Sequence, residues 1–215
     1  MNDRNDVRHR AYDKKGPIVA RNFNKRGFEA TYCPTVEKAL EQAVSYIPPD
    51  HVVSWGGSVS IDEIGLRPYV AEHNHVINRD TATTPEERLE LMRRALLCDT
   101  FIMGTNAATE DGQLFNVDGN GNRVAALAYG PKQVIVIAGM NKFAPTVEAA
   151  MIRARSTAAP INVQRFTGTK TPCYVTGMCG HCKTPDSICA QLLRTRVCRP
   201  AGRIKVIIVG EEIGF

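Results

Sequence analysis

The sequence has no long apolar run and no apolar segment at its start. None of its apolar stretches approaches the roughly 20 residues that a helix needs to cross a membrane, and residues 1–10 are polar and charged, without the apolar centre of a signal peptide. We therefore expect a cytoplasmic protein that does not interact with a membrane.

Aromatic residues are also scarce, at 7% with one Trp, although the net charge is +5. A nucleic-acid-binding protein would usually combine a basic stripe with interleaved aromatic residues, whereas Lys and Arg are scattered here, so we expect no nucleic-acid partner. The Gly-x-Gly-x-x-Gly fingerprint of nicotinamide dinucleotide binding is absent as well. The excess of basic over acidic residues suits binding of a small anionic metabolite.

Strand and helix patterns alternate along the whole chain. Residues 51–55, 101–103 and 205–209 are short apolar runs, residues 133–138 form a continuous one, and helical patterns cover 35–47, 84–97 and 146–158. A continuous apolar run is typical of a strand buried on both faces of a parallel sheet. The sequence therefore predicts an α/β fold with a mostly parallel sheet and flanking helices.

We expect one domain over residues 1–215, with three local features. Residues 114–117 and 123–128 flank a Gly/Asn/Asp turn, which predicts a β-hairpin insertion. Residues 1–30 are expected to form a helical arm, interrupted at Gly16 and Pro17. Residues 171–200 are expected to be a cysteine-rich loop segment.

Five of the seven cysteines lie between Cys173 and Cys198. In a reducing compartment such a cluster indicates a metal or iron–sulfur site. Cys173, Cys179, Cys182 and Cys189 are the predicted ligands, with Cys198 in reserve. Four thiolates suit either a 4Fe-4S cluster or tetrahedral zinc, and the spacing alone does not decide between them. Buried free cysteines are the alternative.

A glycine turn follows the strand at 51–55. Gly56, Gly57, Ser58 and Ser60 would expose backbone N–H groups there and could bind a phosphate or carboxylate. The same sequence also suits a plain turn between a strand and a helix.

Polar residues also follow two of the other predicted strands. Asn106 and Glu110 follow the strand at 101–103, where ligands bind in α/β sheets, and Glu110 could act as a general base. Lys142 follows the strand at 133–138 and could pair with an anionic substrate. The alternatives are an ordinary turn at 104–112 and a solvated lysine at 142.

Several motifs together resemble the LUD family of lactate-utilisation domain proteins. They are residues 56–60, 63–66, 105–112, 121–124, 129–132 and 139–142. The resemblance implies a fold similar to the sugar-phosphate isomerase and CoA-transferase superfamily. It also implies a role in oxidising L-lactate to pyruvate with partner iron–sulfur proteins, and a cleft lined by the 56–60 turn, Asn106, Asn141 and Lys142.

The cysteine cluster departs from the general pattern of this family and indicates a subgroup. We interpret the chain as a redox component that assists oxidation of L-lactate or another small 2-hydroxy acid, with a 4Fe-4S cluster on the four cysteines. The alternative is a non-redox isomerase or transferase type of enzyme, or a metabolite-binding module, with structural zinc. The sequence does not determine whether the chain forms an oligomer.

Overall fold

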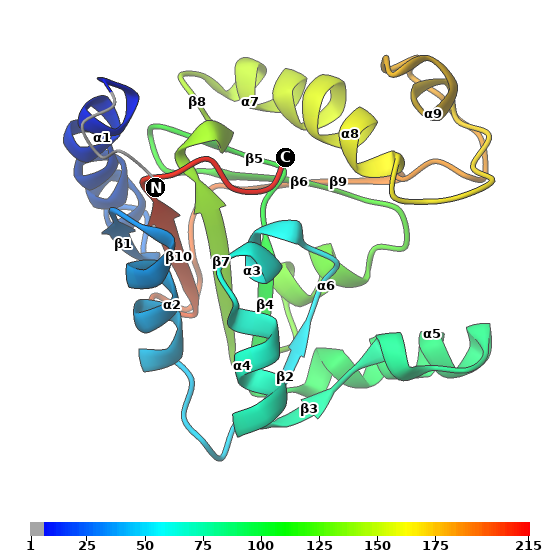
Figure 1. Cartoon of the computed structure of the whole chain (residues 1–215), viewed down its shortest axis with the longest axis horizontal. Coiled ribbons are helices and arrows are strands. Elements are labelled where there is room, and N and C mark those ends of the chain that lie inside the picture. The colour runs from blue at the N-terminus through cyan, green and yellow to red at the C-terminus, as the bar shows by residue number, and fades with distance from the viewer. Residues whose placement is uncertain (1–6) are drawn as a thin grey trace.

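A six-stranded parallel sheet forms the centre of the computed structural model, which describes residues 7–215 (Figure 1). Every neighbouring pair of its strands is parallel. The carboxyl ends of all six strands therefore meet at one edge, where open α/β sheets bind ligands. In spatial order the strands are β1 (Glu29–Cys33), β10 (Ile204–Val209), β7 (Gln133–Gly139), β4 (Thr100–Gly104), β2 (Val52–Trp55) and β3 (His75–Ile77).

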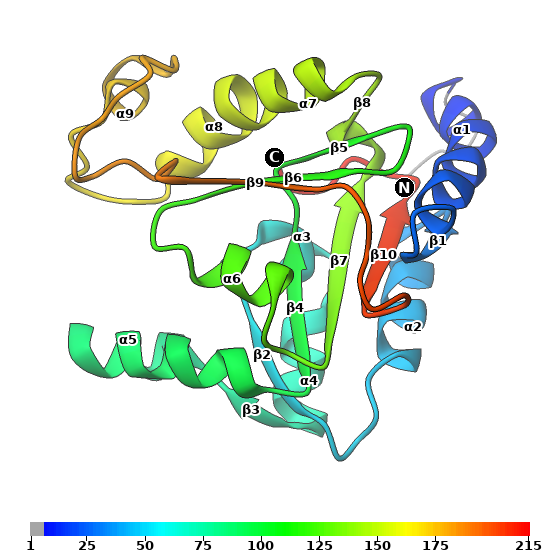
Figure 2. The same ribbon diagram turned by 180° about the vertical axis from the view of Figure 1, so that it is seen from behind.

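Helices cover both faces of this sheet (Figures 1 and 2). In β7, Val134 and Val136 pack into one core, and Ile135 and Ile137 pack into the other, which explains the continuous apolar run. The predicted α/β fold with a mostly parallel sheet is confirmed. The first core includes α1 (Val7–Asn24) and α6 (Asn122–Ala128), and the second includes α2 (Val36–Ser45), α3 (Val59–Glu63) and α4 (Leu66–His73).

A second, four-stranded sheet lies across the carboxyl edge of the first (Figure 2). Its apolar face packs on the helical run that begins after β8. Its strands, in order, are β8 (Phe143–Ala144), β5 (Ala107–Thr109), β6 (Leu114–Asp118) and β9 (Gln191–Thr195). The helical run comprises α7 (Val147–Arg153), a π-helical turn η4 (Ala154–Ala158) and α8 (Ala159–Val163).

The expected hairpin across residues 114–128 is wrong in its second half. Asp118 ends β6, and its carboxylate accepts hydrogen bonds from the backbone N–H groups of Arg123 (2.9 Å) and Val124 (3.2 Å). Gly121, which lies between Asp118 and Arg123 in the sequence and directly precedes α6, takes a φ of +83°. These bonds start helix α6 instead of a strand. The antiparallel hairpin is formed by β5 and β6.

The helices expected at 35–47, 84–97 and 146–158 are present. Each begins after a threonine that accepts a backbone hydrogen bond: Thr35 before α2, Thr84 before α5 (Pro85–Arg94) and Thr146 before α7. Short 3₁₀ turns occur in the described part of the chain at η1 (Arg79–Thr81), η2 (Ala95–Leu97) and η3 (Met140–Lys142).

Two of the expected local features differ from the structure. Helix α1 continues through Pro17, and a Cβ on Gly16 would lie 2.1 Å from the ring of Tyr32, so glycine allows the helix to touch β1. Residues 1–6 of the expected arm lie outside the described residues. The segment 171–200 contains α9 (Pro172–Thr176) and strand β9, so only part of it is loop.

No helix within residues 7–215 is both long enough and apolar enough to span a bilayer.

Candidate functional site

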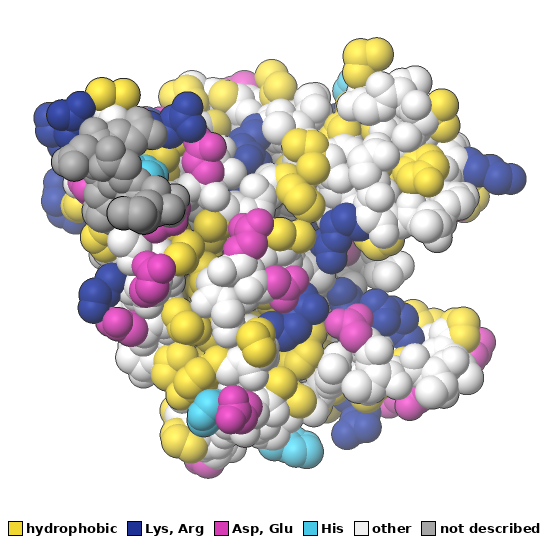
Figure 3. All heavy atoms as spheres, in the orientation of Figure 1, with side chains coloured by type: hydrophobic (Ala, Val, Ile, Leu, Met, Phe, Trp, Pro, Cys, Tyr) yellow, Lys and Arg dark blue, Asp and Glu magenta, His cyan; other side chains and the backbone are white. Residues whose placement is uncertain are grey.

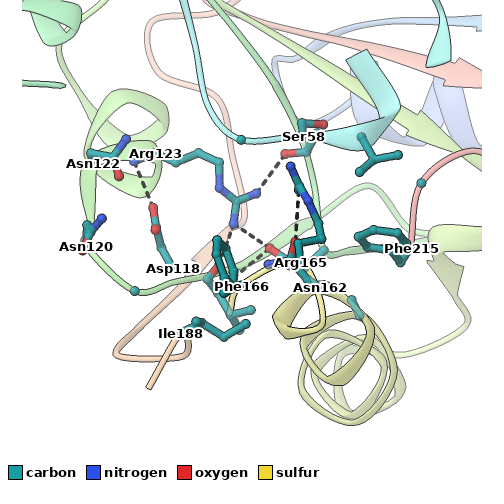
Figure 4. A pocket seen from close by; sticks show the side chains of 18 of the residues that line it. Ser58, Asp118, Asn120, Asn122, Arg123, Asn162, Arg165, Phe166, Ile188 and Phe215 are labelled. Atoms are coloured by element: carbon teal, nitrogen blue, oxygen red, sulfur yellow. Dashed lines mark hydrogen bonds between the residues drawn. The ribbon is translucent and has the colours of Figure 1, made fainter. Parts of the chain in front are cut away.

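A cavity of about 420 Å³ opens at the carboxyl edge of the central sheet. Its floor consists of the turn after β2, the end of β4 and Lys142 after β7, and its walls come from η1, α5, α8 and the loop at 185–188. Figure 3 shows dark blue Lys and Arg side chains gathered in this hollow. Figure 4 shows the lining from close by, with Ser58, Asp118, Arg123, Arg165, Phe166 and Phe215 labelled.

The cavity is predominantly basic. Arg79 and Arg88 share the carboxylate of Asp80, at 3.7 Å and 3.1 Å. Because the basic groups outnumber the acidic ones, the cavity favours an anionic ligand. Among the described residues, the basic side chains of the lining are Arg67, Arg79, Arg88, Arg123, Lys142 and Arg165, and the acidic ones are Asp80, Asp118 and Asp186.

Arg123 connects the two sheets beneath the cavity. Its guanidinium donates hydrogen bonds to the carbonyl oxygens of Gly104 (3.2 Å) and Val117 (2.5 Å), and to Oδ1 of Asn106 (2.8 Å). Burial lowers the pKa of Arg123. A Cβ on Gly56 would lie 2.8 Å from Cδ of Arg123, so the glycine turn leaves room for this side chain.

Lys142 lies at the floor of the cavity, and only 3% of the residue is exposed. Its Nζ is 2.7 Å from Oγ of Ser60 in α3. Burial, and then the nearby charges of Arg153 and Arg123, lower the pKa of Lys142 from 10.5 to about 7. A large part of the amine is therefore neutral near pH 7, a property typical of lysines in functional sites.

The last residues of the chain cover the Lys142–Ser60 pair. A Cβ on Gly214 would lie 2.4 Å from Oγ of Ser60 and 2.8 Å from Nζ of Lys142. The amide of Asn141 donates a hydrogen bond to the carbonyl oxygen of Gly214 (3.2 Å), and Phe215 lines the cavity. The C-terminal residues thus form one wall of the site.

The structure brings most of the residues predicted from sequence together. Gly57, Ser58, Asn106 and Lys142 line the cavity. The other three predicted residues lie behind this lining and contact it. Gly56 contacts Arg123, Ser60 contacts Lys142, and Asn141 contacts Gly214.

Glu110 lies elsewhere. It does not line the cavity, and its carboxylate forms an ion pair with Lys15 of α1. Its backbone carbonyl accepts a hydrogen bond from Asn22 of the same helix (2.9 Å). The contacts of Glu110 thus join α1 to the second sheet. The role of Glu110 as a general base stays a prediction.

The arginines of the cavity were not predicted as site residues from the sequence. No local pattern could group them, because they come from α4, η1, α5 and the turn after α8 with no common spacing: Arg67, Arg79, Arg88 and Arg165. Arg123 had a signal, because it belongs to the motif at 121–124.

Of the predicted metal ligands, Cys173 lies in α9, and Cys179, Cys182 and Cys189 lie in the loop that follows this helix. Burial and the neighbouring thiols of Cys173, Cys179 and Cys182 raise the pKa of Cys189 to about 11. Cys198 lies apart in the core, where its Sγ donates to the carbonyl oxygen of Pro200 (3.1 Å).

Within residues 7–215, no three His, Cys, Asp or Glu side chains lie close enough together to bind a metal ion. The four cysteines predicted as ligands nevertheless match a 4Fe-4S or tetrahedral zinc site in the number and type of donors. The metal site therefore stays a prediction whose donor chemistry fits.

Comparisons with known proteins identify both the sequence family and the fold. The profile of the LUD domain matches residues 17–209. The crystal structure of a DUF162 family protein from Deinococcus radiodurans is similar, with a TM-score of 0.54 and 13% identity over 92% of this chain and 98% of that chain. A likeness at this identity shows the fold.

Two further structures match about half of the chain. Ribose 5-phosphate isomerase A from Methanocaldococcus jannaschii aligns with a TM-score of 0.32 and 18% identity over 52% of this chain and 55% of that chain. eIF2B delta from Chaetomium thermophilum aligns with a TM-score of 0.33 and 16% identity over 54% of this chain and 52% of that chain. A search of curated proteins finds no match.

Proposed function

This chain belongs to the LUD domain family, and we propose that it is a redox component of the lactate-utilisation type that binds a small 2-hydroxy acid in its basic cavity. The observation that carries the proposal is the position of Lys142. A buried amine with a pKa of about 7 lies at the floor of a cavity whose walls are rich in arginine.

Different residues of the cavity would act on the carboxylate and on the hydroxyl group of a 2-hydroxy acid. Arginine is suited to holding a carboxylate because its guanidinium can donate two parallel hydrogen bonds. The neutral amine of Lys142 would accept the proton of the substrate hydroxyl, because its pKa lies near the operating pH of a cytoplasmic enzyme. Ser60, at 2.7 Å, would hold the amine in position.

Oxidation of a 2-hydroxy acid to a 2-oxo acid also breaks the C2–H bond, which releases a second proton to solvent and, in all, two electrons that would have to pass on one at a time to a partner protein. The proposed site for a redox group is the set Cys173, Cys179, Cys182 and Cys189, which suits a 4Fe-4S cluster, with zinc as the alternative. When bound, such a cluster supplies a one-electron carrier that exchanges electrons with a partner protein. The segment 185–188, which lies between the last two of these cysteines in sequence, also lines the cavity, so a change at the cysteines would affect the ligand site.

Metal and sulfide analysis of anaerobically purified protein tests the cysteine site. We expect about four iron and four sulfide per chain with broad visible absorbance, lost in C182S and C189S and retained in C98S, a cysteine buried in the core. Stoichiometric zinc would support the structural alternative. Protein free of metal in the wild type would contradict a metal site of either kind.

Electron transfer tests the redox role separately. The iron-loaded protein should reduce a one-electron dye in the presence of L-lactate or another 2-hydroxy acid, and K142M should lose this activity while retaining its iron. Binding of the acid without dye reduction would support the metabolite-binding alternative, which rests on the basic cavity alone.

A further inference from the structure

We propose that Lys142 forms a covalent imine with a 2-oxo acid bound in the cavity. The inference rests on the proposed function, because a 2-oxo acid is the product of oxidising a 2-hydroxy acid and carries the same carboxylate. It adds to that function a covalent site for compounds that combine a carbonyl group with an anionic group.

The first requirement is a lysine whose amine is accessible from a cavity and free of a carboxylate partner. Lys142 lines the cavity although the residue is 97% buried by its neighbours, with 3% exposed. Within the described chain, its Nζ donates a hydrogen bond to Ser60 Oγ, and no carboxylate lies within ion-pair distance, although the more distant carboxylate of Glu63 acts on it. Glu63 raises the pKa of Lys142, but burial and the charges of Arg153 and Arg123 lower it by more.

The second requirement is an environment that favours the neutral amine. Arg153 is close to Lys142, and its Nε donates to the carbonyl oxygen of Asn141 (3.0 Å), while its Nη1 donates to that of Asn106. Arg123 likewise donates to carbonyl and amide oxygens rather than to a carboxylate. Both cations thus keep their charge beside Lys142. Desolvation beside another cation is the arrangement that activates lysine as a nucleophile toward carbonyl compounds.

Two other lysines of the described chain have the opposite environment. Lys38 is hydrogen-bonded to Glu41 (2.7 Å), and Lys132 pairs with Asp99 (2.6 Å). These carboxylates raise the pKa of both lysines. Near pH 7 their amines stay protonated and unreactive, so the reaction should select Lys142.

The reaction needs no oxidant or reductant. The lone pair of Nζ attacks the carbonyl carbon of the 2-oxo acid, and a proton passes from the nitrogen to the former carbonyl oxygen, which gives a carbinolamine. Loss of that oxygen as water forms the carbon–nitrogen double bond, and addition of water reverses the step. The hydroxyl of Ser60 can relay the proton, and an arginine of the wall can hold the carboxylate.

Reductive trapping tests the imine. The full chain is incubated with pyruvate and sodium cyanoborohydride at pH 7, and the intact mass and a peptide map are recorded. We expect a single pyruvate-derived adduct on the peptide that carries Lys142, with no adduct when L-lactate replaces pyruvate. K142M should give no adduct, and K132M should react like the wild type. An excess of L-lactate should slow trapping in the wild type, a readout that does not depend on the folding of any variant.

Two outcomes would overturn the imine. One is the absence of an adduct in wild-type protein that binds L-lactate, which would leave the proposed function intact. The other is the same adduct level in wild type and K142M, which would mean reaction at surface lysines. Failure to bind L-lactate at all would instead count against the proposed function itself.

Discussion

Nζ of Lys142 lies 2.7 Å from Oγ of Ser60. The contact joins η3, which follows the central strand β7, to α3, which follows the glycine turn after β2. Two segments that are 82 positions apart therefore meet at the floor of one basic cavity.

The pKa of Lys142 predicts how the stability of the protein depends on pH. The folded chain loses the Lys142 proton near pH 7, whereas the unfolded chain keeps it up to its ordinary pKa of 10.5. Between these values the unfolded state binds more protons, so the Lys142 contribution to the free energy of unfolding rises with pH. K142M removes this dependence, and we expect it to be more stable than the wild type at pH 7 by on the order of a few kcal/mol.

Urea unfolding of both proteins between pH 7 and pH 10 measures this effect. The difference in the free energy of unfolding should shrink as the pH rises. K25M, at an exposed position, controls for loss of a surface charge. A constant difference across the range would contradict a buried amine with a lowered pKa.

Removing the guanidinium of Arg123 should loosen the contact between the two sheets. R123M leaves the carbonyl oxygens of Gly104 and Val117 and Oδ1 of Asn106 without this donor. Because each unsatisfied buried polar group costs about 1–3 kcal/mol, we expect a loss of roughly 2–5 kcal/mol in the free energy of unfolding. Thermal unfolding measures it. R123K restores one donor and should fall between R123M and the wild type; equal stability of all three would contradict the bridging role.

A pair of glycine substitutions tests the packing around the site. A Cβ on Gly139 would lie 2.7 Å from two backbone atoms, the oxygen of Glu211 and the nitrogen of Ile213, which cannot move without displacing the C-terminal residues. We expect G139A to lower the free energy of unfolding by about 1–3 kcal/mol, as overpacking does. A Cβ on Gly57 would meet only the end of the Arg79 side chain, at 2.9 Å. G57A should therefore be well tolerated, and equal losses in the two variants would contradict the close approach at Gly139.

The central sheet could be predicted from sequence because its strands are apolar on both faces. The run from Val134 to Ile137 is an example, since alternate residues enter the two cores. The error at residues 123–128 arose from a side chain: the carboxylate of Asp118 starts α6, and a Gly/Asn turn does not reveal that contact. Strand β9 is largely exposed and lacks an apolar pattern, so only its pairing with β6 identifies it.

The candidate site was predictable where functional residues follow strands directly. Lys142 and Asn106 were found in this way, because the topology of a parallel sheet brings strand ends together. The burial of Lys142 could not be predicted, since it depends on Gly214 and on α3, which are distant in sequence. The cavity arginines were missed for the same reason.

Isothermal titration of L-lactate into wild-type protein and K142M tests the central claim most directly. We predict saturable binding to the wild type and binding at least about tenfold weaker to K142M, the change expected when about 1.4 kcal/mol of interaction is lost. K25M, with an exposed lysine replaced, should bind like the wild type. No binding to the wild type, or equal affinity in wild type and K142M, would contradict a 2-hydroxy acid site built around Lys142.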